Sequence, residues 1–347
     1  MPAPARPTLE AIAREASVSL STVSKVLNGR PGVSSATRRR VEELLHDSGY
    51  ARRGVDAERG DAVELVIENL ASEWSVEVIR GVERVTRENG LSMTLSTIGD
   101  YHAVGDDLIA GVLRRKPIAM VLQFSNLTAD HRRQLRTRNI PFVVVDPAGD
   151  PPPEVPAIGA TNWAGGVTAT RHLLALGHRR IAAIGGPEEL MCSRARIAGY
   201  HSALQEAGVP VAPDAVRSAA FSRAAGEQEA RRLLEAAERP TAIVCGNDMQ
   251  ALGVYDAAFA LGLDVPRDLS VVGFDDAPSA AWARPPLTTI HQPLQKMAEE
   301  ATRLALRLRA GEVDSTRLEL ATTLIERGST APPAPPAPAP SESFPTA

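Results

Sequence analysis

The chain is poor in cysteine and contains no long apolar run. Its two cysteines, Cys192 and Cys245, cannot form a disulfide framework, and no cluster of Cys and His has metal-ligand spacing, so no metal site is predicted. No stretch of about 18 apolar residues is present, and the N-terminal segment MPAPARPT lacks the apolar core of a signal peptide. The sequence therefore predicts a soluble, cytoplasmic protein without a membrane anchor, with both cysteines as small buried residues.

The sequence also lacks a nucleotide-binding signature. Gly185-Gly186-Pro187 follows a predicted strand, but no GxxxxGK[S/T] pattern accompanies it, which argues against a phosphate-binding loop. Asp275 and Asp276 could form a catalytic pair of carboxylates, but adjacent residues of a strand point to opposite faces. We therefore expect neither an enzyme nor a bound cofactor.

Charge is distributed unevenly along the chain. The formal net charge is −4, so the molecule as a whole does not favour polyanions. Residues 1–60 contain ten Arg or Lys against seven Asp or Glu and carry +3, whereas the remainder carries −7. A basic head on an acidic body agrees with DNA contact at one end. The signal is modest because only three of the 38 basic residues are Lys, so Arg is favoured along the whole chain.

Residues 8–28 predict two short helices joined by a tight turn at Ala16-Ser17-Val18. Thr8 and Ser19 are good N-caps, since their hydroxyls can accept from otherwise unpaired N–H groups. Asn28-Gly29 ends the second helix with residues that tolerate the left-handed conformation. Apolar residues recur at helical spacing on the inner faces of the two helices, namely Leu9, Ile12, Ala13, Val23, Val26 and Leu27.

A third helix is predicted after this pair. Ser34 or Ser35 caps it, and Gly49 stops it. Its apolar stripe consists of Val41, Leu44 and Leu45. Three helices of ~10 residues can bury one small core together, although none would be stable alone. Residues 1–50 are therefore predicted to form a small all-α helix-turn-helix head.

In a helix-turn-helix the second helix enters the major groove of DNA and the first crosses the backbone. The outward face of the second helix carries Leu20, Ser21, Ser24 and Lys25. Lys25 can reach guanine acceptors, Ser21 can donate or accept, and Leu20 can pack on a thymine methyl. Phosphate contacts fix the register without reading sequence. The residues predicted to make phosphate contacts are Ser19, Thr22, Asn28 and Thr37, and Thr8 is a further predicted DNA-contacting residue.

The full string resembles the DNA-binding head of the LacI/GalR (lactose/galactose-repressor) family of bacterial regulators. The pattern T-[LI]-x-x-[IV]-A-x-x-A-x-V-S-x-x-T-V-S-[KR]-V-[LV]-N runs from Thr8 to Asn28. An amphipathic helical hairpin with a solvated serine face is the alternative, and the length of the pattern argues against it. Ser17 stands where the family usually has Gly, and it costs some stability if its backbone is left-handed.

From Ala62 onward, apolar strands alternate with helices in two successive series. The first series has strands near 62–70, 91–98, 118–124 and 141–146, and helices near 76–89, 106–115 and 129–139. The second, after a Pro-rich loop at 151–156, has helices near 163–176, 194–207, 224–238 and 249–261, and strands near 180–186, 241–248 and 269–276. This alternation predicts parallel sheets covered on both faces. Two series predict two similar lobes.

Motifs in the body extend the family resemblance to about residues 8–328. They are RGVE at 80–83, GHRRIAAIGG at 177–186, SRARIAGY at 193–200, NDMQALGVY at 247–255, DLSVVGFDD at 268–276 and PPLTTIHQP at 285–293. The resemblance implies an α/β two-lobed domain, 62–328, with a type I periplasmic-binding-protein-like fold. It places the N-lobe at about 62–160 and 292–328, with a helix near 292–310 and a last strand near 317–325, and the C-lobe at about 161–291.

The Pro-rich tail, 329–347, is of low complexity and is expected to be disordered. It contains no leucine heptads, so a coiled coil that would join dimers into tetramers is not predicted. A homodimer is the expected assembly.

Polar and aromatic residues follow several predicted strands. Ligands of open parallel sheets bind beyond the carboxyl ends of the strands. Carboxylates, amides and an Arg fork can hold neighbouring hydroxyls, and an aromatic face covers the apolar side of a sugar ring. The predicted effector-binding residues are Trp74, Ser75, Asp146, Ser193, Arg196, Phe221, Asn247, Asp275 and Gln292.

The resemblance supports most of this set. Trp74, Ser75, Asp146, Arg196, Phe221, Asn247 and Asp275 match positions that line the effector cleft of the family. Each residue also has a structural alternative. An Asp after a strand is often a helix cap, a Trp is often part of a core, and Arg196 could form a surface salt bridge.

The linker at 51–61 departs from the family. Members usually carry a hinge helix of the form P-N-x-x-A-R-x-L, whose Leu wedges into the minor groove. Here the Asn, the Ala-Arg pair and the Leu are absent, and Val55 is the only bulky apolar residue. Our hypothesis is that Arg52, Arg53 and Arg59 contact phosphate or an A·T-rich minor groove in place of the wedge.

Together these features predict a dimeric transcriptional repressor that binds double-stranded operator DNA. A small sugar-like effector bound between the two lobes would act as inducer, through different affinities for two conformations. A corepressor-dependent regulator of a non-sugar metabolite remains an alternative. A sugar-binding receptor for a transporter is disfavoured by the head and by the missing signal segment.

Overall fold

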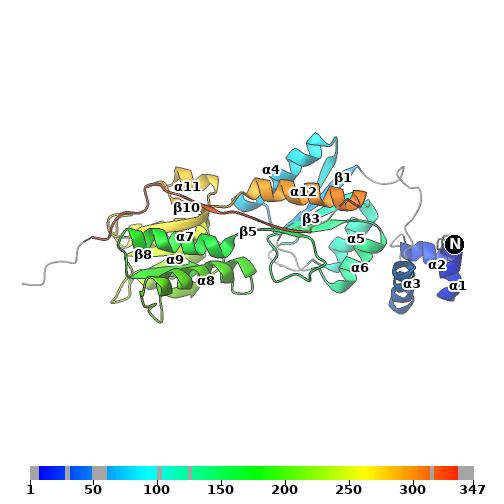
Figure 1. Cartoon of the computed structure of the whole chain (residues 1–347), viewed down its shortest axis with the longest axis horizontal. Helices are drawn as coiled ribbons and strands as arrows, with labels where there is room; N and C mark the ends of the chain where they lie inside the picture. Colours follow the sequence, from blue (N-terminus) through cyan, green and yellow to red (C-terminus); the bar gives the residue numbers. More distant parts are fainter. Residues whose placement is uncertain are drawn as a thin grey trace, which may run out of the picture. The chain divides into compact units, whose positions relative to one another are not determined.

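The computed structural model describes residues 8–27, 32–48, 61–99, 104–123, 127–312 and 316–334 (Figure 1). The predicted DNA-contacting residues Asn28, Arg52 and Arg53 lie outside the described residues. So do Gly29, Gly49, Val55 and Arg59, on which the predicted helix ends and the linker hypothesis depend. None of the described helices is both long enough and apolar enough to cross a membrane.

The head contains the three predicted helices, which are α1 (Leu9–Glu15), α2 (Leu20–Leu27) and α3 (Ser35–Asp47). Hydroxyls cap them as expected. Thr8 Oγ1 accepts from the Ala11 N–H at 3.3 Å, and Ser19 Oγ accepts from the Thr22 N–H at 3.1 Å. Ser34 Oγ accepts from the Thr37 N–H at 3.2 Å, so Ser34 rather than Ser35 is the cap. The buried core is formed by Ile12, Ala13, Ala16, Val23, Val26, Leu27, Val41 and Leu45.

Ser17 in the α1–α2 turn has a φ of 58°. This is the left-handed conformation, which costs an L-residue with a Cβ free energy that glycine avoids. The turn therefore has the geometry that favours glycine, with serine in place.

The chain divides into two compact units, each with a six-stranded sheet, and the head belongs to the first of them. Unit 1 holds the described residues up to Ala160 together with Pro293–Leu320, and unit 2 holds Thr161–Gln292 and the described residues from Ala321 onward. The predicted α/β fold is confirmed.

Unit 1 has the strand order β11-β5-β4-β3-β1-β2, and all its pairs are parallel. Its elements are β1 (Ala62–Ile67), α4 (Glu73–Glu88), β2 (Ser92–Thr97), α5 (Asp106–Arg115), β3 (Ala119–Gln123), α6 (Ala129–Thr137), β4 (Phe142–Val145), β5 (Ala157–Ala160), α12 (Leu294–Ala310) and β11 (Arg317–Leu320). Apolar side chains such as Val66, Leu122 and Val144 bury one face of the sheet. The long helices α4, cyan in Figure 1, and α12, orange, pack against each other.

Unit 2 has the strand order β12-β10-β9-β8-β6-β7, in which only the β10–β12 pair is antiparallel. Its elements are α7 (Asn162–Ala175), β6 (Ile181–Gly185), α8 (Met191–Glu206), β7 (Val216–Ser218), α9 (Arg223–Leu234), β8 (Ala242–Cys245), α10 (Asp248–Ala260), β9 (Ser270–Asp275), α11 (Pro278–Trp282), β10 (Thr288–His291) and β12 (Thr323–Ile325). Two buried clusters cover its faces, one with α9 and α10 and one with α7 and α8. Cys192 and Cys245 are free and buried, as predicted.

The end of the chain differs from the sequence-based expectation. One last strand near 317–325 was expected in the first lobe, but β11 pairs with β5 in unit 1 and β12 pairs with β10 in unit 2. The chain therefore changes units between Leu320 and Thr323, and residues from Ala321 belong to unit 2. Each short strand completes one edge of a sheet, which accounts for the division.

The expectation of a disordered tail is wrong for its first residues: Ser329 is buried and its Oγ donates to the Val271 carbonyl at 2.6 Å, and the Ala331 N–H donates to Ser270 Oγ at 3.1 Å.

Candidate functional site

The outward face of α2 gathers the residues predicted to read bases. Leu20 is 46% exposed, and Ser21, Ser24 and Lys25 are exposed beside it. Val23, Val26 and Leu27 on the other side of the helix are buried in the head core. This one-sided burial leaves a polar helix face with one cation and one apolar side chain open to a partner.

Of the residues predicted to contact phosphate, Ser19 is the N-cap of α2, while the hydroxyls of Thr22 and Thr37 pair with the cap serines. Ser19 Oγ lies 2.8 Å from Ser21 Oγ and 2.8 Å from Thr22 Oγ1. Ser34 Oγ donates to Thr37 Oγ1 at 2.8 Å. These hydroxyls therefore hold the helix starts in place, and their roles toward DNA stay predictions.

In unit 2, Arg196 is the centre of a buried polar cluster. It lies on α8 and is only 6% exposed, so the alternative of a surface salt bridge does not apply. Its Nε donates to Asn162 Oδ1 at 2.9 Å, and Nη1 donates to the Gly246 carbonyl. Nη1 also lies 3.8 Å from Asp275 Oδ1. The guanidinium is thus fixed from three elements.

Two aromatic rings flank this guanidinium. The Arg196 Cζ atom lies 3.8 Å from the centroid of the Phe274 ring and 5.8 Å from that of Phe221. A cation at this distance from a ring is attracted by its negative face. Phe221 also packs near Ser193, because a Cβ added to Gly186 would collide with both side chains.

The other predicted residues of unit 2 lie at the same strand ends. Gln292 Nε2 donates to Asp275 Oδ1 at 2.6 Å. Asn247 Oδ1 accepts from the Gln250 N–H at 2.9 Å, so this atom is the N-cap of α10. Ser193 Oγ and Gln292 Oε1 are buried and have no hydrogen-bond partner among the described residues. The structure therefore brings together five of the six predicted residues of this unit, and Asn247 lies next to Gly246, whose carbonyl Arg196 binds.

Asp248 is a buried carboxyl of this region that the sequence did not single out. Its Oδ1 accepts from Thr289 Oγ1 at 2.5 Å and its Oδ2 from the Ala277 N–H at 2.8 Å. Burial raises the pKa of Asp248 well above its usual range, and the nearby carboxylate of Asp275 raises this pKa further. Asn162, the other residue missed, begins α7 and resembles an ordinary helix start in sequence.

In unit 1, Trp74 and Ser75 lie in the first turn of α4 and are both buried. Ser75 Oγ donates to Gln123 Oε1 at 3.1 Å, at the end of β3. Asp146 follows β4 with a φ of 49° and is 1% exposed. Gln123 pairs in register with Val145, the residue before Asp146. The three predicted residues thus lie at the carboxyl ends of neighbouring strands, with Gln123 as an unpredicted member.

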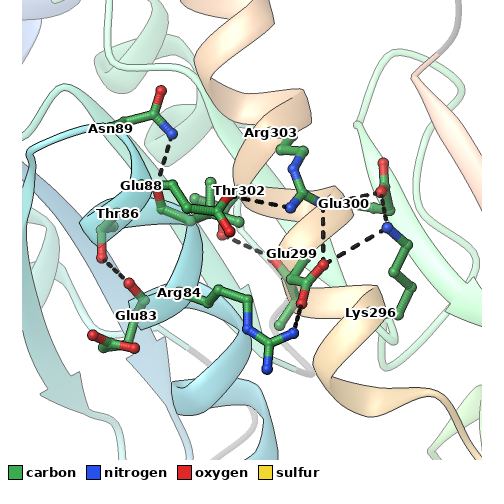
Figure 2. A network of polar contacts seen from close by, with 12 residues as sticks. Glu83, Arg84, Thr86, Glu88, Asn89, Lys296, Glu299, Glu300, Thr302 and Arg303 are labelled. Carbon is green, nitrogen blue, oxygen red and sulfur yellow. Dashed lines mark hydrogen bonds and ion pairs between the residues drawn. The ribbon is translucent and has the colours of Figure 1, made fainter.

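Helix α12 fixes the helix that carries Trp74 and Ser75. A Cβ added to Gly81 of α4 would lie 2.4 Å from the Gln295 carbonyl oxygen, so the two helices touch closely there. Further along, Glu299 of α12 accepts from Arg84 at 2.9 Å and from Arg303 at 3.1 Å, as Figure 2 shows. Lys296 lies 3.7 Å from the same carboxylate. The close contact and the ion pairs set the position of α4 along α12.

Two family profiles match this chain, one over the head and one over most of unit 2. A family profile described as "Bacterial regulatory proteins, lacI family" matches residues 8–53. A second profile, "Periplasmic binding protein-like domain", matches residues 170–330.

Curated relatives match over nearly the whole chain. The ribose operon repressor of Escherichia coli (strain K12) is 34% identical over 333 residues, which cover 93% of this chain and 99% of that protein. The HTH-type transcriptional repressor CytR of the same organism is 32% identical over 328 residues, which cover 93% and 96%.

Solved structures of transcriptional regulators are also similar to this chain over nearly its whole length. A complex of the transcriptional regulator CelR with cellobiose has a TM-score of 0.71 and 32% identity, and covers 93% of this chain and 100% of that one. A lac repressor dimer bound to operator and the anti-inducer ONPF has a TM-score of 0.69 and 26% identity, and covers 94% and 100%.

Proposed function

This chain belongs to the LacI family of bacterial regulatory proteins, and on that premise we propose that it is a dimeric repressor controlled by a sugar-like effector. Both curated relatives are named as repressors, and the lac repressor structure is a dimer bound to operator.

Base reading is assigned to Leu20, Ser21 and Lys25 on the exposed face of α2. Lys25 reaches guanine acceptors, and the apolar tip of Leu20 packs on a thymine methyl. Two heads of a dimer bind the half-sites of a near-palindromic operator.

Dimerisation is supported by two large apolar side chains on unit 2. Phe259 on α10 is 88% exposed and Trp282 on α11 is 73% exposed. Alanines of both helices pack into the same buried cluster, so the two helices are neighbours in the fold. Exposed aromatics of this size are characteristic of protein interfaces. A second copy of the chain is the proposed occupant.

The effector is proposed to be an uncharged polyhydroxylated molecule such as an unphosphorylated sugar. The carboxylate of Asp275, the unpartnered Gln292 Oε1 and the hydroxyl of Ser193 can all accept hydrogen bonds from ligand hydroxyls. Unit 1 has its own buried carboxylate, Asp146, and hydroxyl, Ser75, at its strand ends. Acceptors therefore outnumber donors, which suits hydroxyl groups and opposes a phosphate.

The surroundings of Arg196 are the main support for this effector chemistry. A buried guanidinium beside a carboxylate has Nε and Nη1 already bonded within the protein, so its Nη2 offers the remaining N–H donors to ligand hydroxyls. The two flanking phenylalanine rings add an aromatic surface. The effector is proposed to act as an inducer, which requires that it bind the DNA-incompetent conformation more tightly than the other.

Two measurements on the purified full chain test the proposal. DNA pulldown with sequencing should enrich a near-palindromic sequence, and the absence of any enriched sequence would contradict the regulator function. A thermal-shift screen should then show stabilisation by sugars rather than by nucleobases or phosphorylated sugars. Stabilisation by nucleobases that also tighten operator binding would instead support a corepressor-dependent regulator.

A further inference from the structure

Asp275 and Asp276, at the end of β9, both have a positive φ, which is unfavourable for residues with a Cβ. Asp275 has a φ of 113° and Asp276 a φ of 59°. An L-residue with a Cβ persists in this region only where surrounding contacts hold it there. Since Asp275 carries the carboxylate assigned to the effector, the contacts that hold this turn also aim that carboxylate.

Asp276 is the anchored member of the pair. Its Oδ1 accepts from Arg327 Nη2 at 2.5 Å, and its Oδ2 lies 3.0 Å from His291 Nδ1. Both carboxylate oxygens are therefore engaged, by groups from two different segments. The side chains of Arg327 and Asp276 are 20% and 17% exposed, so water screens their ion pair less than it screens one at the open surface.

Arg327 is itself tied to the sheet at two further points. Its Nη1 donates to the Leu287 carbonyl at 2.8 Å, and its backbone N–H donates to Thr288 Oγ1 at 2.9 Å. These bonds fix Arg327 just after β12, beside the first residues of β10. The guanidinium that binds Asp276 is consequently held in one position by the sheet.

Two side-chain hydrogen bonds connect the end of β9 to the end of β10. His291 lies opposite Asp275 in the ladder, while Gln292 bonds to Asp275 and His291 bonds to Asp276. When Asp276 is held in place, its bond to His291 holds the end of β10 as well. Gln292, which follows His291 in the chain, then binds the carboxylate of Asp275. The two aspartates form one connected turn.

We propose that Arg327 is a positioning residue of the effector site. It holds the carboxylate of Asp276, which maintains the left-handed turn and keeps the carboxylate of Asp275 directed at Arg196 and Gln292. The hydrogen bonds of Arg327 go to Asp276, Leu287 and Thr288 rather than to Asp275, and Arg327 lies in the C-terminal segment that returns to unit 2. The inference rests on the proposed function in that Asp275 binds the effector.

The alternative is that Arg327 only attaches the C-terminal segment to the sheet. Asp276→Asn separates the two readings, because it removes the charge that Arg327 holds and leaves the bond of Arg327 to the Leu287 carbonyl. Asn also tolerates the left-handed region better than most residues do, so the substitution adds no backbone strain. Arg327→Gln removes the anchor from the other side.

Hydrogen exchange of the effector-free full chain tests the turn directly. The Ala277 amide donates to Asp248, and the Gln292 amide donates to the Asp275 carbonyl at 3.2 Å. Both amides should exchange about tenfold faster in Asp276→Asn and in Arg327→Gln, with little further change in the double variant. Arg317→Gln is the matched control, since Arg317 contacts carbonyls of Pro151 and Pro152 in unit 1, and it should leave both amides unchanged. Unchanged exchange in Asp276→Asn would overturn the proposal.

Binding measurements with D-ribose and cellobiose complete the test. Whichever probe stabilises the unsubstituted protein should bind Asp276→Asn about tenfold more weakly, while Arg317→Gln binds it normally. Equal affinity in Asp276→Asn and the unsubstituted protein would overturn the positioning role. If neither sugar binds the unsubstituted protein, the proposed effector chemistry is contradicted, and the exchange experiment still decides the role of Arg327.

Discussion

Gln292 donates a hydrogen bond of 2.6 Å from Nε2 to Oδ1 of Asp275, and so joins the residue that follows β10 to the end of β9. Its other amide atom, Oε1, is buried without a partner among the described residues. One amide group therefore both orients a carboxylate and presents an acceptor. In the proposed effector site, Gln292 would therefore orient the carboxylate of Asp275 and accept a hydrogen bond from a ligand hydroxyl.

Replacing Gln292 by Met should weaken effector binding about tenfold, which corresponds to about 1.4 kcal/mol. The change keeps the side-chain volume but removes the donor to Asp275 and the free acceptor. Isothermal titration with a sugar found in the thermal-shift screen measures the loss. Gln205→Met, at an exposed position of α8 in the same unit, should bind the sugar normally. Equal affinities for the two variants would remove Gln292 from the site.

Lys25→Gln and Thr37→Val should affect DNA binding in different ways. Loss of a base-reading cation should cost about 1–3 kcal/mol and relax the preference at one base pair of each half-site. Loss of a phosphate contact should weaken all operator sequences alike. Affinities for a set of single-base operator variants at one fixed salt concentration separate the two patterns. A uniform loss for Lys25→Gln would show that Lys25 contacts phosphate instead.

Ser17→Gly should stabilise the head by about 0.5 kcal/mol. Glycine removes the cost of a φ of 58° but adds entropy to the unfolded chain, so only part of the strain is recovered. Ala11→Gly in α1 is the control, because glycine within a helix should destabilise by about 1 kcal/mol. Hydrogen exchange of buried head amides such as that of Val23 reports both changes. A loss of protection in Ser17→Gly would mean that the serine side chain has a stabilising role of its own.

Sequence patterns predicted local structure best where local chemistry decides it. The helix Asp106–Arg115 has the predicted bounds, and Thr8, Ser19 and Ser34 cap helices as their hydroxyls indicate. The strand-end rule also selected Arg196, Phe221, Asp275 and Gln292, which lie near one another because carboxyl ends of parallel strands share one edge of a sheet, and their role toward an effector stays a prediction.

Other features depend on pairing between distant segments and were missed for that reason. The strand β12 has three residues and acquires its identity from antiparallel pairing with β10, so its own sequence does not assign it to a unit. Gln123 and Asp248 look like the end of an apolar run and the start of a helix. Only the fold brings Gln123 to Ser75, and Asp248 to Thr289.

Gly81→Ala should destabilise unit 1 by roughly 1–3 kcal/mol, even though alanine favours a helix by about 1 kcal/mol. The new Cβ would lie 2.4 Å from the Gln295 carbonyl oxygen and 2.6 Å from Ala298 Cβ, so α4 and α12 must separate. Gly159→Ala in β5 has no atom within 4 Å of its Cβ and should be neutral. Thermal unfolding compares the two variants. Equal midpoints would mean that the α4–α12 contact adjusts without cost.

Unit 2 should lose stability as the pH falls below about 6.5, because two histidines are held neutral beside the C-terminal segment. Burial lowers the pKa of His178, which lies 2.9 Å from the Ala331 carbonyl through Nε2, and burial also lowers the pKa of His172, whose Nε2 lies 2.9 Å from Thr330 Oγ1. Below the unfolded pKa, the unfolded chain binds more protons than the folded one, so acid favours unfolding. The loss should begin near pH 6.5 and continue down to the lowered folded pKa values.

His178→Gln isolates this effect, since glutamine keeps hydrogen-bonding groups but takes up no proton. The unfolding midpoint should be measured at about pH 7.5 and about pH 5.5 for both proteins. The decrease between the two conditions should be smaller in His178→Gln, and smaller again when His172→Gln is added, even if both variants are less stable at the higher pH. The buried carboxyl of Asp248, whose raised pKa has the opposite linkage, is common to all three proteins and cancels in the comparison. An equal decrease in all three would show that these histidines do not carry the acid sensitivity of the unit.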